Sequence, residues 1–373
     1  ILSQASANLS KSMRVGRAFD VLARRIRAEG PMSVADYMAI ALSHPEVGYY
    51  ATRDPFGPSG DFVTAPEVSQ VFGELLGLWC AERWQAMGEP QQLLLVELGP
   101  GRGTLMADAL RAAQLLPAFR AALDIHLVEA SALLREQQRR ALASEQITWH
   151  RSFAEVPEGP LLLIANEFFD ALPIRQFVKT SEGWAERLIA LDEGEDQLVW
   201  AVGRLLPPGL PLPQDAQQGS IAELSPLGTA LAEEIGRRLA RFGGAALIID
   251  YGHDGKAIGD SFQALRQHRP LDPLECPGDA DLTAHVNFGS LVAAAEKAGA
   301  KAHGPVEQAR FLEALGIKER SEALARNATP QQRRQLLAAL DRLISPSHMG
   351  SRFKAVALTP PDSSIPAGFP VTP

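Results

Sequence analysis

The stretch Val96-Glu97-Leu98-Gly99-Pro100-Gly101-Arg102-Gly103-Thr104 decides the fold of this chain. The apolar run 93–96 before it is typical of a strand buried on both faces of a parallel sheet. Residues 104–110 after it have the apolar spacing of a helix. The glycines are therefore expected in a strand-to-helix turn, where glycine permits positive φ and lets a ligand approach the bare backbone. The helix start would offer unpaired N–H groups and the positive end of its dipole.

Two acidic residues indicate which cofactor this turn suits. Dinucleotide-binding enzymes use G-x-G-x-x-G, whereas this chain has G-x-G-x-G with Glu97 just before it. A carboxylate there would repel a pyrophosphate and attract a cation, such as the amino group of S-adenosylmethionine. Glu129 ends the next expected strand, 124–128, and can accept hydrogen bonds from both ribose hydroxyls. The pattern predicts an S-adenosylmethionine site rather than an ordinary βα turn, with candidate cofactor-binding residues Glu97, Gly99, Gly101, Gly103 and Glu129.

Composition narrows the class of protein. The 373 residues suffice for one large domain with insertions or for two domains, and the net charge of -8 argues against a general nucleic-acid surface. Cys80 and Cys276 give no disulfide framework and fit a reducing compartment. The histidines lack metal-ligand spacing, so we predict no metal. Since no apolar run approaches the ~20 residues of a membrane span, we expect no membrane insertion.

The first part of the chain is expected to form helices and a loop over the cofactor. Residues 1–28 resemble a transit peptide in composition, but an apolar stripe at helical spacing favours a short leader followed by a helix over 15–28. The loop from 49 to 64 is long and rich in glycine and proline, so we expect a lid, with Thr64 as a candidate cofactor contact. Thr64 and Glu67 have capping-box spacing and predict a helix start.

The segment Asn166-Glu167-Phe168-Phe169-Asp170 follows an expected strand, 161–165. Ligands of open α/β sheets lie beyond the carboxyl ends of the strands, so this segment should face the transferred methyl group. Glu167 and Asp170 are two carboxylates within one turn, which suits bidentate hydrogen bonding to a guanidinium. Asn166 could also cap a helix whose first turn carries both acids. The candidate catalytic residues are Glu167, Asp170, Asn166 and His285, the last in the loop after a strand expected over 245–249.

The remaining segments complete the expected architecture. Phe153, after a strand at 147–150, either packs in the core or lies beside the adenine. Residues 174–202 alternate like antiparallel strands, and a polar loop is expected over 253–283. Two late strands, 302–306 and 352–358, predict an antiparallel edge. The predicted domains are 1–70 (helices and lid loop), 71–359 (cofactor-binding domain) with an insertion at 171–243, and a loose tail at 360–373.

These motifs together resemble the MidA family, which includes the mitochondrial complex I assembly-factor protein arginine methyltransferase. The resemblance implies an α/β fold, namely the Rossmann-like sheet of a class I methyltransferase with a helical N-terminal segment and an antiparallel insertion. It implies Gly99, Gly101 and Glu129 as cofactor residues, and Asn166 and Glu167 in the active site. The matching stretches, in chain order from residue 44 to 358, are HPEVGYYATRD, GDFVTAPEVSQVFGELLG, ELGPGRGTL, NEFFDALP, DYG, PGDADLTAHVNF, FLEALGI and MGSRFKAVAL.

The resemblance also implies a function. It points to protein arginine N-methylation linked to respiratory complex I assembly, with a protein substrate that is a complex I subunit. The alternatives are a non-catalytic assembly chaperone with the same fold and a small-molecule methyltransferase. Intact glycines and acids at the expected site argue against the chaperone. We expect a bacterial cytoplasmic protein, with the mitochondrial matrix as the alternative; the oligomeric state is not predicted.

Overall fold

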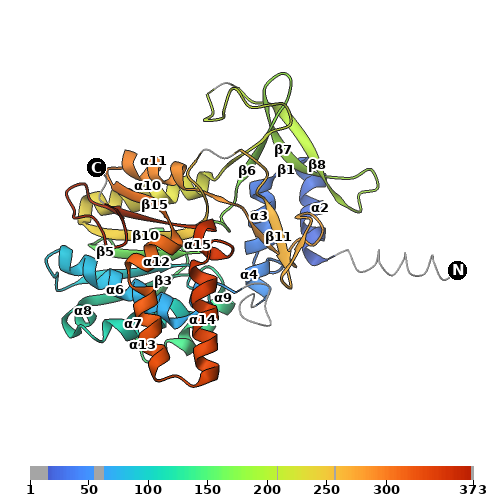
Figure 1. Cartoon of the computed structure of the whole chain (residues 1–373). Coiled ribbons are helices and arrows are strands. Elements are labelled where there is room, and N and C mark those ends of the chain that lie inside the picture. Colours follow the sequence, from blue (N-terminus) through green and yellow to red (C-terminus); the bar gives the residue numbers. More distant parts are fainter. Residues whose placement is uncertain (1–15, 54–62, 208, 256–257, 371–373) are drawn as a thin grey trace. The chain divides into compact units, whose positions relative to one another are not determined.

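The computed structural model describes residues 16–53, 63–207, 209–255 and 258–370, and it divides into two compact units (Figure 1). Unit 1 comprises 1–62, 171–228 and 256–285, and unit 2 comprises 63–170, 229–255 and 286–373. Residues 54–62 of the predicted lid and residues 1–12 of the predicted leader lie outside the described residues. The lid therefore stays a prediction.

A mostly parallel sheet forms the centre of unit 2. Its strand order is β15–β16–β10–β5–β2–β3–β4, with β14 paired to β10. The strands β2, β3, β4, β5 and β10 are parallel, whereas β15 and β16 form the predicted antiparallel edge. The bounds are β2 Leu93–Leu98, β3 Leu123–Val128, β4 Ile147–His150, β5 Leu161–Asn166, β10 Gly244–His253, β14 Val286–Asn287, β15 Lys301–Glu307 and β16 Phe353–Thr359.

The order of this sheet fixes where a ligand binds. The chain runs from β2 outward to β3 and β4, and then returns to β5 on the other side of β2. The carboxyl ends of β2 and β5 therefore flank the point where the strand order reverses, which is where open α/β sheets bind ligands. The predicted class I methyltransferase sheet is confirmed.

Helices cover both faces of this sheet (Figure 1). Leu93 and Leu95 of β2 pack into a core with α6 and α7, and residues at alternate positions face the other way, because side chains alternate along a strand. On the opposite side lie α10 and α11, where the backbone of Ala295 closely approaches Gly236. The bounds are α5 Ala65–Val68, α6 Gln70–Ala86, α7 Thr104–Ala113, α8 Pro117–Ala122, α9 Ala132–Ala141, α10 Pro226–Phe242 and α11 Phe288–Lys297, with a short 3-10 turn, η1, at Phe153–Glu155.

A group of helices between β15 and β16 had no counterpart in the sequence-based prediction. Their bounds are α12 Gln308–Ala314, α13 Ile317–Arg326, α14 Pro330–Ile344 and α15 Met349–Arg352. The buried carboxylate of Glu74 on α6 accepts from Arg320 of α13 at 2.8 Å and from Arg111 of α7 at 3.1 Å. Arg342 of α14 donates to the carbonyl of Val63 at 3.2 Å. The helices thus bind to the segment that precedes α5.

Unit 1 combines three separate stretches of the chain. Its larger sheet has the order β1–β7–β6–β9 with β8 paired to β7, and β12–β11–β13 form a second sheet. The prediction of a polar loop over 253–283 was wrong, because three short strands there pair with one another and bury Ala264 and Leu282 against the helices. The bounds are α2 Arg17–Glu29, β1 Met32–Ser33, α3 Val34–Ser43, α4 Tyr49–Thr52, β6 Arg175–Lys179, β7 Trp184–Leu191, β8 Leu198–Leu205, β9 Ile221–Leu224, β11 Gln263–Arg266, β12 Arg269–Leu271 and β13 Asp281–Thr283.

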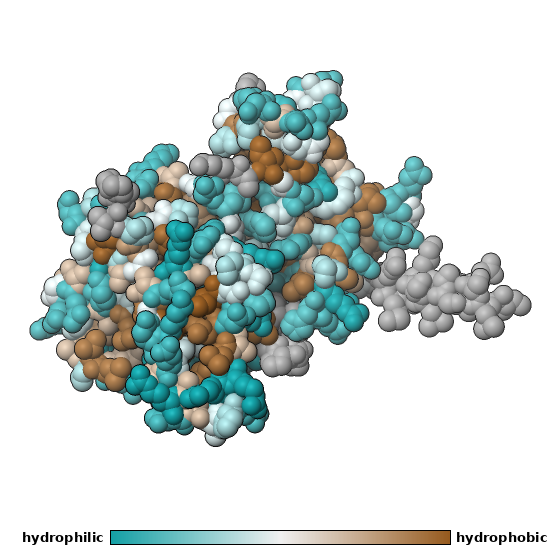
Figure 2. Space-filling model, viewed as in Figure 1, coloured by the Kyte–Doolittle hydropathy of each residue, from teal (hydrophilic) through white to brown (hydrophobic). Residues whose placement is uncertain are grey.

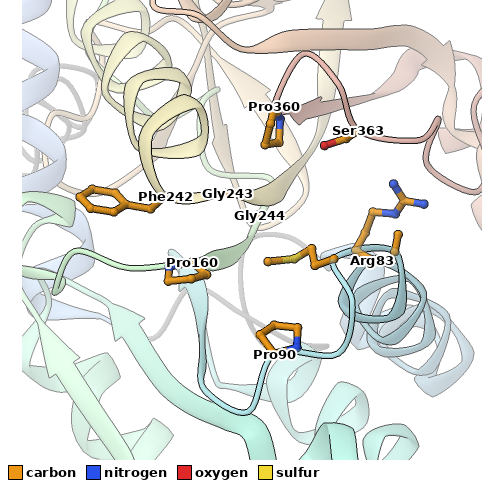
Figure 3. Close-up of a pocket in the computed structure, with 10 residues that line it drawn as sticks. Arg83, Pro90, Pro160, Phe242, Gly243, Gly244, Pro360 and Ser363 are labelled. Atoms are coloured by element: carbon orange, nitrogen blue, oxygen red, sulfur yellow. The ribbon is translucent and has the colours of Figure 1, made fainter.

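A cavity of about 300 Å³ opens at the amino end of the parallel sheet (Figure 3). Pro160 precedes β5 and Gly244 begins β10, and both line it together with Met87 and the buried Arg83. Arg83 hydrogen-bonds to the carboxylate of Glu82 and to Ser364. Since cofactors of this fold bind at the opposite, carboxyl edge, this cavity is separate from the candidate site.

Hydrophilic residues and limited apolar patches alternate over the face shown in Figure 2. In the part of the chain that the structure describes, no helix is both long and apolar enough to cross a bilayer.

The packing of α6 on α7 yields a prediction about stability. A Cβ atom at Gly77 would lie 2.6 Å from the carbonyl oxygen of Ala109, and backbone cannot move aside as a side chain can. We expect Gly77→Ala to lower the free energy of unfolding by about 1–3 kcal/mol, measured by urea denaturation. Gly259→Ala is the control, because nothing lies within 4 Å of its added Cβ. Equal stability of the two variants would contradict this close approach.

Candidate active site

The glycine turn joins β2 to α7 as predicted. The φ angles of Gly99, Gly101 and Gly103 are 62°, 54° and 85°, in the left-handed region that favours glycine. Within the described residues, α7 begins at Thr104 with no side-chain cap. The turn thus leaves backbone N–H groups at a helix start, where an anionic or hydroxyl-bearing ligand can bind.

Glu97 is buried beside this turn with an unsatisfied oxygen. Its side chain is 3% exposed, and Oε2 has no hydrogen-bond partner among the described residues. Burial raises the pKa of Glu97 to about 8. A buried carboxylate of this kind is costly unless a cation or donor reaches it. The residue therefore suits a cation, and its contact with the amino group of S-adenosylmethionine stays a prediction.

Glu129 follows β3 at the same edge of the sheet. Its Oε1 accepts from the Ser131 N–H at 2.7 Å, and Oε2 accepts from Gln138 Nε2 at 3.3 Å. Burial raises its pKa to about 7, although these hydrogen bonds oppose the shift. The acid is thus held in place at this edge, and its contact with ribose hydroxyls stays a prediction.

Gln138 of α9 is a site residue that sequence reasoning missed. It is fully buried, and Nε2 also donates to the carbonyl of Gly101 at 2.8 Å, while Oε1 accepts from Trp149 Nε1 at 3.0 Å. One amide therefore ties the glycine turn and Glu129 to β4. The sequence did hold one signal for this role. Gln138 stands four positions after Leu134, so this polar residue lies on the same, buried face of the helix as Leu134.

The segment after β5 is a turn and not a helix, so the prediction that Asn166 caps a helix was wrong. Glu167 has φ 50°, which stops a right-handed helix from starting. Its Oε1 accepts from the N–H of Ala65 at 2.8 Å and from Asn166 Nδ2 at 3.2 Å. Asn166 is buried, and its Oδ1 has no hydrogen-bond partner among the described residues. We name residues 166–170 the acceptor turn.

Segment 64–68 lies between the glycine turn and the acceptor turn. Thr64 stands at the start of α5, but its side chain makes no cap, and Glu67 instead accepts from Thr104 Oγ1 at 2.5 Å. The predicted capping box was therefore wrong, because a tertiary contact takes the Glu67 carboxylate. A new helix, α6, starts after Ser69, whose side chain accepts from Val71 N–H. The Ala65–Glu167 and Glu67–Thr104 bonds connect this segment to both turns.

Asp250 near the end of β10 lies under the acceptor turn. It is fully buried, and its Oδ2 accepts from the N–H groups of Phe168, Phe169 and Asp170 at 3.1, 2.9 and 3.2 Å. Burial, reinforced by the nearby Asp170 and Glu167 carboxylates, raises the pKa of Asp250 well above its ordinary value. The motif DYG contributed only to the family resemblance, and Asp250 was not among the predicted site residues.

The two other candidates are placed differently. Phe153 is buried, and the guanidinium of Arg238 lies over its ring at 4.3 Å from the centroid. This contact supports packing in the core, and contact with an adenine stays a prediction. His285 belongs to unit 1 and its N–H donates to Ser261 Oγ at 2.9 Å, whereas the other candidate residues belong to unit 2. A catalytic role for His285 likewise stays a prediction.

A parallel sheet with a glycine turn between β2 and α7, and with acids near the ends of β2 and β3, is typical of a class I methyltransferase. Residues 75–306 match the family described as "Putative S-adenosyl-L-methionine-dependent methyltransferase", and the chain belongs to this family. It is 39% identical to "Protein arginine methyltransferase NDUFAF7, mitochondrial" of Danio rerio, over 94% of this chain and 88% of that one. The protein of the same name from Homo sapiens is 39% identical over 90% and 82%.

A solved structure agrees with this assignment. The crystal structure of a Burkholderia thailandensis protein bound to S-adenosyl-homocysteine is similar to this chain with a TM-score of 0.80 and 29% sequence identity. The match covers 98% of this chain and 94% of that one. The predicted fold, cofactor and family are thereby confirmed.

The buried acids predict a pH dependence of cofactor binding. With pKa values of about 8 for Glu97 and about 7 for Glu129, both are largely protonated at pH 6. A bound ammonium and ribose hydroxyls favour the ionised forms, so binding should release protons and the affinity should rise from pH 6 to 7.5. Calorimetry at pH 6.5, in buffers of different ionisation enthalpy, measures the protons released.

Glu97→Gln isolates one of these acids. We expect this variant to release fewer protons when the cofactor binds, because only Glu129 would still lose a proton. In the cofactor-free protein, the raised pKa of Glu97 favours folding at low pH, and this contribution is lost as the pH rises through about 8. Because the affinity is expected to rise with pH, the increase in melting temperature that S-adenosylmethionine causes should also grow with pH. Unchanged proton release in Glu97→Gln would exclude Glu97 from the cofactor site.

Gln138 yields a second prediction. Gln138→Met keeps the volume but leaves the Gly101 carbonyl and the Trp149 N–H, both half-buried, without their partner. Each unpaired group should cost about 1 kcal/mol or more. We expect the Kd for S-adenosylmethionine to rise about tenfold or more, with a small effect on turnover at saturating cofactor. Gln114→Met, at the exposed end of α7, is the control. An unchanged Kd in Gln138→Met would show that this amide does not organise the site.

Proposed function

We propose that this chain transfers a methyl group from S-adenosylmethionine to an arginine side chain of a protein. The observation that carries the proposal is the buried Oδ1 of Asn166, which has no hydrogen-bond partner among the described residues. This acceptor atom lies next to Glu167, at the carboxyl end of β5 where the strand order reverses. It suits a substrate that brings its own N–H donors.

The acceptor turn touches the cofactor turn. A Cβ atom at Gly99 would lie 2.7 Å from Cδ2 of Phe168, so the Phe168 ring packs directly on the glycine turn. Glu167 directly precedes Phe168 in the chain, and Asn166 precedes Glu167. Both residues are therefore near a side chain, Phe168, that contacts the glycine turn. A substrate held by these residues would be next to the transferred group.

The polar groups of the acceptor turn suit a guanidinium. Asn166 Oδ1 and the carboxylates of Glu167 and Asp170 are acceptors, and a guanidinium has five N–H donors in one plane and no acceptor. A cationic planar group would thus meet both the charge and the hydrogen-bonding pattern.

The chemistry required of the chain is mostly alignment. Bound S-adenosylmethionine supplies a methyl group on a positively charged sulfur. The glycine turn, Glu97 and Glu129 hold the cofactor, and Asn166 and Glu167 orient the acceptor nitrogen in line with the methyl carbon. Since charge delocalisation makes a guanidinium a weak nucleophile, Glu167 would localise its charge and accept its proton on a carboxylate oxygen.

The relatives suggest the kind of target. We propose a protein substrate, because the curated relatives are named protein arginine methyltransferases, and a complex I subunit, because the family resemblance implies one. Those relatives are also named mitochondrial, which matches our alternative location, while a bacterial cytoplasmic location stays a prediction. Mass spectrometry of the proteome with and without this protein would identify the target as a lost arginine methylation.

Glu167→Gln tests the acceptor site. Gln keeps an oxygen for the Ala65 and Asn166 donors but removes the charge. We expect methyl transfer to lose about 2–4 kcal/mol of transition-state stabilisation, or roughly 30- to 1,000-fold in single-turnover rate. Asp170→Asn should have a smaller effect in the same direction. Cofactor affinity, measured by titration, should hardly change.

The outcomes separate the competing functions. Full turnover in Glu167→Gln would remove Glu167 from the mechanism, and lost cofactor binding would move it into the cofactor pocket. Methylation of small molecules alone would favour a small-molecule methyltransferase. A wild-type protein that binds S-adenosylmethionine but changes no methylation would favour the assembly chaperone.

A further inference from the structure

The acceptor turn is shaped by a carboxyl group that comes from another strand. Three successive N–H groups, those of Phe168, Phe169 and Asp170, converge on Oδ2 of Asp250 at 2.9–3.2 Å. Successive N–H groups arranged in this way form a concave nest that binds an anion. Here the nest holds a side chain of the protein itself.

The register of the sheet places Asp250 there. Ile249 of β10 pairs with Asn166 of β5, and the N–H of Glu167 donates to the carbonyl of Ile249 at 2.9 Å. Asp250 is the next residue along β10, and its Oδ1 is occupied by the N–H of Tyr251 at 2.9 Å. Both oxygens of this fully buried carboxylate therefore bond to backbone. The side chain is held at a fixed place beneath the turn.

The turn has a backbone conformation that needs such support. Glu167 has φ 50°, which a residue with a side chain rarely adopts unless its surroundings compensate. The three hydrogen bonds to Asp250 begin at the very next residue, Phe168. They thus hold the chain immediately after the strained position, in the conformation that aims the Glu167 side chain at the N–H of Ala65.

We propose that Asp250 is a positioning residue for methyl transfer: its carboxylate fills the nest of the acceptor turn and thereby sets the position of Glu167. The residue acts through Glu167 and does not contact the methyl acceptor. This inference rests on the proposed function, because it assigns a role in the same reaction. It also explains why a carboxyl group is kept fully buried at the end of β10.

A double-mutant cycle tests the proposal. Asp250→Asn, Glu167→Gln and the double variant are compared in single-turnover transfer of labelled methyl from S-adenosylmethionine to a lysate of cells that lack this protein. Asn has nearly the same shape as Asp, but its side-chain NH2 group would face a backbone N–H that now donates to a carboxyl oxygen of Asp250. We expect a loss of at least tenfold in the wild-type background, and less than twofold when Glu167 is already Gln. The Kd for S-adenosyl-homocysteine should change less than threefold.

A second variant removes one N–H group and leaves Asp250 intact. Incorporation of 3-phenyllactate at Phe169 keeps the benzyl side chain and replaces the amide N–H by an ester oxygen. We expect a three- to tenfold slower transfer, again with unchanged cofactor affinity. Glu74→Gln is the matched control, because Glu74 is a buried carboxyl group of unit 2 that bonds to Arg111 and Arg320. It should lower the melting temperature and leave the transfer rate unchanged.

The outcomes distinguish this inference from the function on which it rests. Additive effects in the cycle, or a full rate in both Asp250→Asn and the ester variant, would overturn the positioning role while the wild type still methylates. No transfer by the wild-type protein would overturn the proposed function itself. If Asp250→Asn does not fold, the ester variant alone decides: a rate equal to that of the wild type contradicts the proposal.

Discussion

The parallel register of β2, β5 and β10 is the constraint on which the site depends. It brings the carboxyl end of each strand to one edge of the sheet. Glu97, Asn166 and Asp250 therefore all lie near this edge although they are far apart in the chain, with Glu97 paired to Ile164 and Asn166 paired to Ile249. A shift of one residue in any strand would turn its terminal side chain to the other face, because side chains alternate along a strand. The burial of Leu162, Ile164 and Leu247 in one core opposes such a shift.

Among the carboxyl groups that are buried at this edge, Asp250, Glu129 and Glu97 are each compensated differently. Asp250 is surrounded by four backbone N–H groups, and Glu129 accepts from Ser131 and Gln138. Glu97 retains an oxygen with no partner in the described part of the chain. Since a buried carboxylate without a partner is costly, the least compensated group is the one best suited to bind a cation from outside. The same physical rule thus singles out Glu97, among these three acids, as the one suited to an external cation.

Local patterns failed where a tertiary partner competed for the same group. Thr64 and Glu67 have the spacing of a capping box, yet Glu67 bonds to Thr104 because α5 packs next to α7. Asn166 has the features of a helix cap, yet the N–H groups that a helix would use are taken by Asp250. The strands over 253–283 were missed because each has only three or four residues, and their pairing is visible only once the sheet forms.

The sequence by itself determined the order of the parallel strands and of the helices between them, the glycine turn, and the places of Glu97 and Glu129 near the ends of β2 and β3. These features depend on local apolar periodicity and on residues a few positions apart. Only the tertiary structure decided that Gln138 joins the glycine turn to β4, and that Asp250 organises the turn of Glu167. The physical reason is that these bonds join residues on different strands and helices. Their energy depends on distance and burial in the folded sheet, which local periodicity does not encode.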